Sequence, residues 1–176
     1  DFADADSFLD SNAADFTINE KILATYGMGT FQLDDLTLVA GIRVEQTDVD
    51  LLGKVVTEDV FIAGERRVSQ DYTKILPSIN AKYEFNDEII GRAAYYAAVV
   101  RPAFGDLAPA VLFNDDRDEV ELGNPDLDPL TADNFDLSLE YYPTELSVLS
   151  VGVFYKDIQD AIFPATYDIA DLPSNI

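Results

Sequence analysis

The side chains that could carry chemistry in this chain are mainly carboxylates, because the sequence contains no histidine and no cysteine. The commonest general base, the commonest transition-metal ligand and the thiolate nucleophile are therefore absent. No Ser-His-Asp set can be assembled, and no phosphate-binding glycine loop is present. The sequence accordingly predicts no enzyme and no bound cofactor.

A dense acidic run lies between residues 114 and 121, and carboxylate oxygens are ligands that suit Ca²⁺. The run lacks the glycine and the final glutamate of an EF-hand loop. Solvation and surface repulsion are therefore the simpler prediction for Asp115, Asp116, Asp118, Glu119 and Glu121.

A second group of candidates occurs at alternate positions of segments in which polar and apolar residues change places at nearly every step. If these segments are strands, the polar members share one face of a sheet. Mixed charges there suit contacts with a substrate or a protein domain, whereas a solvated face needs only to be polar. The solvated face is the prediction for most of them, and Arg92 and Lys156 are the better contact candidates. The set is Arg43, Glu45, Lys74, Arg92, Tyr96, Asp136, Glu140 and Lys156.

The alternation is clearest in residues 72–101. Odd positions are mainly apolar and even positions mainly polar in residues 73–85, and the pattern resumes after the turn at residues 86–88. A strand that crosses a bilayer needs roughly 9–11 tilted residues with one apolar and one polar face. Both limbs meet this length, which predicts a transmembrane β-hairpin.

The same pattern predicts hairpins over residues 16–47 and 134–163. In the first strand the apolar side is predicted to hold even positions such as Ile18, Ile22 and Tyr26, with Glu20 as an exception. Aromatic residues gather before each short turn, where they suit a headgroup girdle or ordinary cross-strand packing. They are Phe31, Tyr83, Phe85, Tyr141 and Tyr142.

Long segments connect and flank the hairpins, at residues 1–15, 48–71, 102–133 and 164–176. In outer-membrane barrels short turns face the periplasm and long loops face outside. The sequence therefore predicts an all-β, antiparallel up-and-down meander of about six strands in three hairpins, part of a large transmembrane β-barrel. A short loop strand is expected at residues 60–63.

The outer segments add further candidates. Phe104 and Phe113 suit either stacking on sugar rings or burial as loop anchors. Asn124 belongs to a turn sequence that is expected to fix how the loop re-enters the wall, and Asp128-Pro129 suits the start of a short helix. Arg101-Pro102 is expected to end a strand, with a ligand role for Arg101 the lesser alternative.

The formal net charge of −23 excludes an ordinary nucleic-acid binder, which needs a basic surface. No stretch reaches the apolar length of a transmembrane helix, and no signal peptide is recognised at the first residues. The chain is expected to be an internal piece of a longer protein.

Several stretches in order resemble the C-terminal half of the barrel of TonB-dependent outer-membrane receptors. They are residues 72–83, 92–95, 101–109, 123–129, 135–142 and 153–158, and with the first hairpin they cover nearly the whole chain. The stretches at 76–80 and 123–127 look most like a branch linked to carbohydrate uptake.

The resemblance implies active uptake of a scarce nutrient, an oligosaccharide or a ferric siderophore, across the outer membrane of a Gram-negative bacterium. It implies as partners a plug domain, the TonB system, the nutrient and outer-membrane lipid. No plug domain and no TonB box are seen in this sequence, and about six strands cannot close a barrel. The alternative is a soluble, secreted all-β module for carbohydrate binding or adhesion.

Overall fold

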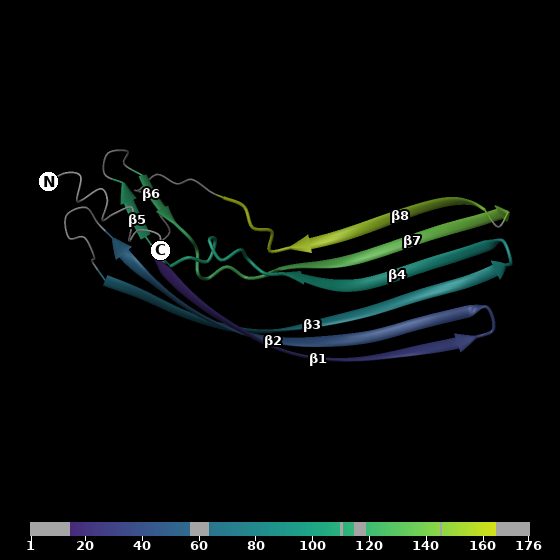
Figure 1. The fold of residues 1–176 in the computed structure, drawn as a ribbon, viewed down its shortest axis with the longest axis horizontal. Helices are drawn as coiled ribbons and strands as arrows, with labels where there is room; N and C mark the ends of the chain where they lie inside the picture. Colours follow the sequence, from purple (N-terminus) through teal and green to yellow (C-terminus); the bar gives the residue numbers. More distant parts are fainter. Residues whose placement is uncertain (1–14, 57–63, 110, 115–118, 145, 165–176) are drawn as a thin grey trace.

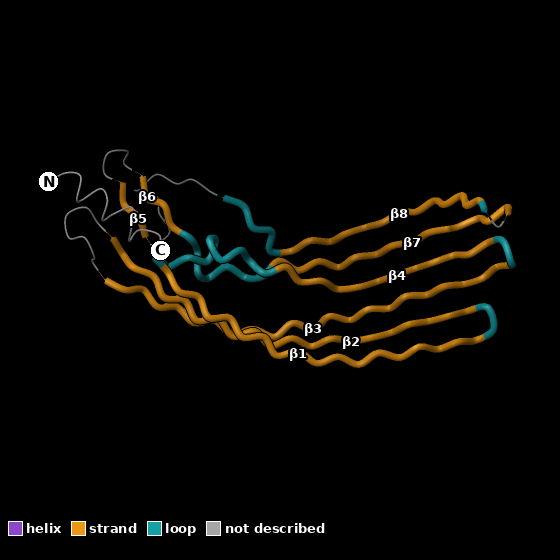
Figure 2. Tube along the Cα trace, viewed as in Figure 1, coloured by secondary structure: helices purple, strands orange, loops and turns teal. Residues whose placement is uncertain are grey.

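The computed structural model describes residues 15–56, 64–109, 111–114, 119–144 and 146–164. Six long strands form one curved sheet (Figures 1 and 2). They are β1 (Phe16–Leu33), β2 (Leu36–Val56), β3 (Gly64–Asn86), β4 (Ile89–Val100), β7 (Leu130–Thr144) and β8 (Ser147–Gln159). Two short strands, β5 (Val111–Asn114) and β6 (Glu119–Leu122), lie between β4 and β7 in the sequence. Over the described ranges no helix is long and apolar enough to cross a membrane.

The long strands follow one another in the sheet as an antiparallel meander, β1-β2-β3-β4-β7-β8. The short turns lie together at one end of the sheet, and the connection from β4 to β7 starts from the other end (Figure 1). β5 adds a parallel pairing to the end of β2, at Val55 and Val56. The predicted all-β meander of six strands in three hairpins is therefore confirmed, with β5 and β6 as an addition.

The tight turns explain why the hairpins reverse where they do. Asp34 takes a positive φ of 47° in the turn between β1 and β2, a conformation that aspartate tolerates better than most residues. In the next turn the Asn86 side-chain oxygen accepts hydrogen bonds from the backbone N–H groups of Glu88 and Ile89. The turn chemistry thereby fixes the pairing register of these two hairpins.

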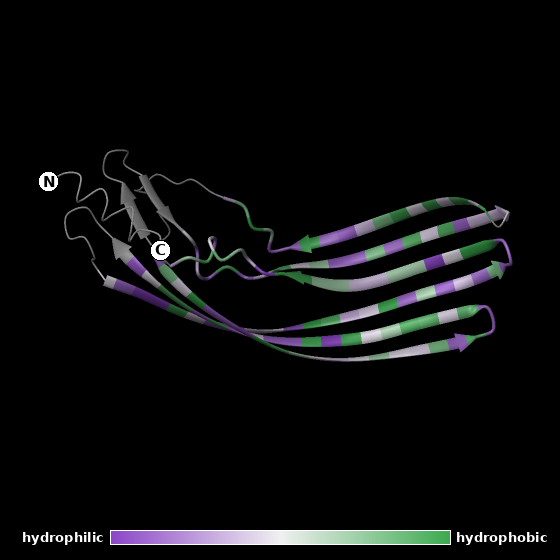
Figure 3. Cartoon of the chain, in the orientation of Figure 1, coloured by the Kyte–Doolittle hydropathy of each residue, from purple (hydrophilic) through white to green (hydrophobic). Residues whose placement is uncertain are grey.

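The register divides the residues between two faces, because residues directly opposite on paired strands share a face. We call the face that contains Glu45 and Thr47 the inner face, and its opposite the outer face. Figure 3 shows how hydrophobic and polar residues alternate along the strands. The outer face is largely apolar and solvent-exposed, including Ile79 (41%), Leu137 (58%) and Val151 (66%). These side chains do not form the centre of a globule.

The prediction for the first strand was wrong. Ile18, Ile22 and Tyr26 pair with Leu51, Thr47 and Arg43 of β2, which places them on the inner face. β1 carries apolar residues on both faces, including the exposed Leu23 and Leu33 on the outer one. The alternation of polar and apolar residues therefore does not show which face of β1 is the inner one. The pairing register, which the tight turn sets, decides it.

Two other expectations differ from the structure. Residues 48–56 and 64–71, expected as loop, continue β2 and β3 as a paired ribbon. Their acidic residues are outer-face positions, where Ser69 donates a hydrogen bond of 2.7 Å to Asp50. Asp128-Pro129 begins no helix and leads directly into β7. The strand expected at residues 60–63 lies outside the described residues.

The register places Phe31, Tyr83 and Tyr141 on the outer face near the short turns, and the Phe85 ring lies on the same face over Gly91. A role of these rings in a headgroup girdle stays a prediction. Tyr83 and Phe85 pack edge to face with ring centroids 4.9 Å apart. Tyr142 is the exception, because its hydroxyl donates a hydrogen bond to Glu140 on the inner face.

Candidate functional site

A loop folds back onto the inner face at the end of the sheet away from the short turns. We call residues 101–109 and 123–129 the strap. The two segments of the strap are joined where the Asn124 N–H donates to the Asp106 carbonyl at 2.7 Å. Gly123 makes this approach feasible, since an added Cβ would lie 2.7 Å from the Ala108 carbonyl oxygen. The strap is therefore a compact unit.

Apolar packing holds the strap against the wall. Leu107 is buried against Val49 and Leu51 of β2, with Val68 of β3 packed beside them. The strap prolines Pro102, Pro109, Pro125 and Pro129 are also buried. Gln70 of β3 donates a hydrogen bond of 2.6 Å to the Pro125 carbonyl. This small cluster is the hydrophobic core of the described residues.

Ionic contacts fix the first residue of the strap. Arg101 follows β4, yet its guanidinium reaches Glu45 on β2 and lies 3.6 Å from a carboxylate oxygen of Glu20 on β1. Glu45 also accepts a hydrogen bond of 2.6 Å from Arg43. Thr47 lies 3.4 Å from the Arg101 guanidinium. We call Glu20, Arg43, Glu45 and Arg101 the upper cluster.

The pair of Glu45 and Arg101 in the upper cluster is partly shielded from solvent, which strengthens its charge interaction, whereas the side chain of Arg43 is 46% exposed. The side chain of Glu45 is 10% exposed and that of Arg101 is 26% exposed. Burial alone would lower the pKa of Arg101, but the hydrogen bond and charge of Glu45 outweigh it and raise the pKa. Arg101 is thus a permanent cation bound to two carboxylates.

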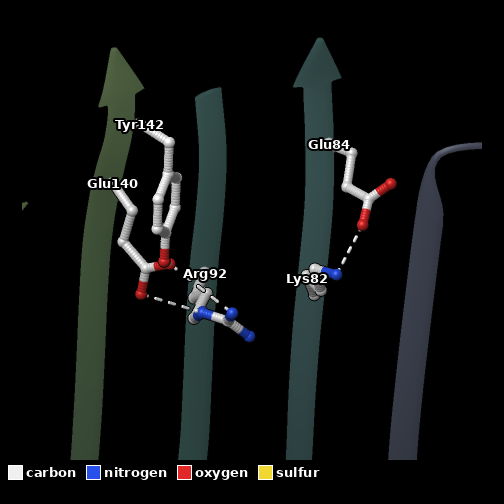
Figure 4. Close-up of polar contacts among 5 residues, drawn as sticks. All are labelled: Lys82, Glu84, Arg92, Glu140 and Tyr142. Carbon is white, nitrogen blue, oxygen red and sulfur yellow. Dashed lines mark hydrogen bonds and ion pairs between the residues drawn. The ribbon is translucent and has the colours of Figure 1, made fainter. Parts of the chain in front are cut away.

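A second group of charges lies on the inner face toward the short turns (Figure 4). Arg92 of β4 contacts Glu140 of β7 at 3.0 Å, and the Tyr142 hydroxyl donates to the same carboxylate at 2.9 Å. On β3, Lys82 pairs with Glu84. We call these five residues the lower cluster. Its groups are exposed enough for water and salt to screen them.

The inner face is hollowed over the middle of the sheet. The hollow has a volume of about 660 Å³ and reaches from β2 to β8. Its lining includes the aromatic ring of Phe154 and the polar side chains of Asn80, Lys82, Arg92, Asp136 and Ser138. This surface can bind a polar ligand or a polypeptide segment, but it holds no nucleophile with an activating base.

The structure brings together some of the residues predicted from alternation. Arg43 and Glu45 belong to the upper cluster, and Arg92 and Glu140 belong to the lower cluster. Asp136 lines the hollow. Lys74, Tyr96 and Lys156 share the inner face but lie outside both clusters. Their contact with a substrate or a plug stays a prediction.

The outer-segment candidates lie in or near the strap. Phe104 is 54% exposed on the strap, so it is no buried anchor. Asn124 is a strap residue whose side-chain oxygen accepts a hydrogen bond from the Asp126 N–H. Phe113 belongs to β5, but its side chain lies outside the described part, as do Asp115 and Asp116. In the portion of the chain that is described, no group of three or more acidic residues could hold a metal ion.

Sequence reasoning missed two features of the site. It assigned no shared role to Arg101 and Glu20. Both residues carried a signal in the sequence, because Arg101 precedes a proline and Glu20 is a charged residue among apolar positions. It also gave no role to Asn134, which is 3% exposed and donates to the carbonyl oxygens of Tyr96 and Ala132. A buried amide in a polar wall has no distinctive sequence pattern.

A sheet with an apolar outer face, short turns at one end and a polar inner face defines a transmembrane β-barrel wall. The model of the Outer membrane protein beta-barrel family matches residues 2–172. The chain belongs to this family, and the protein is an outer-membrane protein. A search of the curated proteins found no match.

Proposed function

We propose that this chain forms the wall and outer vestibule of a TonB-dependent receptor that takes up a scarce nutrient through the outer membrane of a Gram-negative bacterium. The nutrient is an oligosaccharide or a ferric siderophore. The observation that carries the proposal is the strap, held on the inner face by Arg101, Glu45 and Leu107. An inward-folded, anchored segment narrows the outer mouth and suits controlled entry.

The inner face supports the partners that this function requires. The lower cluster offers charges of both signs to a plug domain inside the barrel, which TonB would displace. The hollow beside it, with Arg92, Asp136 and Phe154, offers polar and aromatic contacts to the plug or to a passing ligand. Binding and passage need no bond-making chemistry, and the proposed role is therefore not enzymatic.

The soluble carbohydrate-binding module is the weaker alternative. A water-soluble sandwich buries the apolar face of its sheet against a second sheet. Here the outer face leaves Leu137, Val151 and Val153 more than half exposed. Family membership also favours the membrane wall.

The test is uptake by a bacterium that expresses the intact receptor. A deletion strain is supplied with iron chelates and oligosaccharides one at a time, with and without functional TonB. The proposal predicts that one class of nutrient restores growth only when both receptor and TonB are present. Growth that needs the receptor but not TonB would overturn the active-uptake mechanism.

The Arg92→Ala variant then tests the inner face, with Lys21→Ala, on the outer face of β1, as the matched control. We expect the first variant to lower uptake several-fold and the second to leave it unchanged. Equal uptake by the two variants at equal receptor levels would remove the lower cluster from the proposal.

A further inference from the structure

One edge of β3 has a neighbouring strand along only part of its length. β2 pairs with β3 as far as Gly64, but β4 pairs with β3 only as far as Ser78. From Ala97 to Val100, β4 pairs with β7 alone. β3 therefore runs on beyond the end of β4, as Figures 1 and 2 show. We call residues 67–76 of β3 the open edge.

The open edge presents backbone groups that have no partner in the described part of the chain. In an antiparallel ladder, every second residue directs its N–H and C=O groups away from the paired strand. At the open edge these groups point toward the side that β4 leaves, and no backbone hydrogen bond from a described loop reaches them. No residue of the open edge is buried. An unpaired row of this kind is a template for one further strand.

The structural devices that usually cover such an edge lie elsewhere. Proteins protect edges with proline, bulges or covering loops. Pro77 is just outside the open edge, and the pairing with β2 continues along the edge without a register shift. The strap packs on the inner face instead, beside Val68, and accepts a hydrogen bond from Gln70. β3 can therefore accept a strand at this edge.

The charges of the open edge favour an acidic partner. Lys74 is directly opposite Glu45, but that carboxylate is bound within the upper cluster. Neither Lys74 nor Arg67 forms an ion pair with a described residue, although the chain has 34 acidic residues against 11 basic ones. Asp71 lies between them in the sequence, so the open edge holds two cations and one anion.

The open edge lies outside the membrane. The short turns of outer-membrane barrels face the periplasm, and the open edge is toward the opposite end of β3. On the outer face of β3, Ile75 is followed toward Gly64 by Thr73, Asp71 and Ser69, so the apolar band ends here. A polypeptide at the cell surface can therefore reach the open edge.

We infer that the open edge binds an extended segment of a separate protein at the cell surface, as an added antiparallel strand. Backbone hydrogen bonds supply the affinity of such an addition, and side chains supply its specificity. The added strand takes the place beside β3 that β4 leaves. It carries acidic residues opposite Lys74 and Arg67 and a basic residue opposite Asp71. The inference depends on the family and not on the proposed transport.

A peptide probe tests the inference on the intact protein in mild detergent. The probe is a fluorescein-labelled ten-residue peptide of threonine and valine, with glutamate at its third and tenth positions and lysine at its sixth. Two further probes carry N-methyl groups on either the odd or the even backbone nitrogens. Fluorescence anisotropy measures their binding. We expect only one of the two methylated probes to bind, because alternate N–H groups of an added strand face β3.

Hydrogen exchange, measured by mass spectrometry, locates the bound probe. We expect every second amide of the open edge to exchange fast in the wild type and to slow when the unmethylated probe binds. Amides in the middle of β7 and β8 should not change.

Charge reversal tests the register. Arg67→Glu should weaken binding several-fold, and a probe with lysine at the tenth position should restore it. Lys21→Glu is the matched control, because it reverses a cation on the outer face of β1, and it should bind as the wild type does.

Three results would overturn the inference. Equal binding of the two methylated probes would exclude an added strand, and absence of binding would show that the charges protect the edge from pairing. Slow exchange along the whole open edge before any probe is added would mean that another segment of the intact protein covers it. Unchanged binding by Arg67→Glu would contradict the proposed register.

Discussion

Arg101 and Glu45 form an ion pair that passes over β3, from the end of β4 to the middle of β2. The two residues are 56 positions apart in the sequence. Because Arg101 is also the first residue of the strap, this contact links the path of the loop to the inner wall. The strap is anchored at its start by charge and farther along by the packing of Leu107.

Arg101→Ala should loosen the strap without unfolding the sheet. The variant leaves Glu45 with one partner fewer, which costs roughly 1–3 kcal/mol for a partly buried pair. We expect faster hydrogen exchange at the amides of Asp106, Leu107 and Asn124, measured by mass spectrometry. Amides in the middle of β7 and β8 serve as the internal reference. Unchanged exchange in the strap would show that packing alone holds it.

Gly123→Ala should separate the two segments of the strap. The new methyl group would meet the backbone of Ala108 and Asp106 at less than 3 Å. Backbone atoms cannot move aside without strain, so we expect the free energy of unfolding to fall by roughly 1–3 kcal/mol. Thermal unfolding in detergent measures it. Gly105→Ala is the matched control, because nothing lies within 4 Å of its added Cβ. A similar effect of the two variants would contradict the close-contact explanation.

Leu107→Ala should destabilise the strap by removing its main apolar contact. Truncation of a buried leucine costs about 2–5 kcal/mol, and the lower end is expected in so small a core. Denaturant unfolding with a probe attached to the strap gives the value. Phe104→Ala removes a larger side chain of the same strap that is exposed, and it should cost less than Leu107→Ala. A larger stability cost for Phe104→Ala than for Leu107→Ala would mean that Phe104 is buried in the intact protein.

Val151→Lys and Ser150→Lys test which face of β8 meets the membrane. A lysine on the lipid-facing side costs up to roughly 2–4 kcal/mol, depending on depth, whereas an inward one is tolerated. We expect Val151→Lys to reduce stable insertion into phospholipid vesicles, and Ser150→Lys to insert as the wild type does. Resistance of the inserted protein to urea extraction gives the measure. Equal insertion would contradict the assignment of the two faces.

Much of the fold follows from local pattern. Alternation and turn chemistry predict the hairpins, and they assign Arg92, Asp136 and Glu140 to the polar face. They fail in β1, where Ile22 and Leu23 are both apolar and only pairing with β2 decides which is inside. They also fail at residues 48–56, a segment that contains two aspartates, a glycine and five aliphatic residues and that continues β2.

The site is less predictable than the fold because its main contacts join distant segments. No local signal connects Glu20, Glu45 and Arg101, which meet only after four strands are aligned. Gly123 can be recognised as a turn residue, but its close approach to Ala108 depends on how the loop folds. Outside β1, the face of a residue is thus encoded by the local alternation, whereas its contact partner depends on how distant segments pair.

The sheet also has two edges. Among the described strands, β1 pairs only with β2, and β8 pairs only with β7. Within hydrocarbon each peptide group without a partner costs several kcal/mol, and water is not there to replace it. An edge strand with unpaired peptide groups is therefore unstable within the bilayer. In the membrane, Phe16–Leu33 and Ser147–Gln159 must each pair with a further strand.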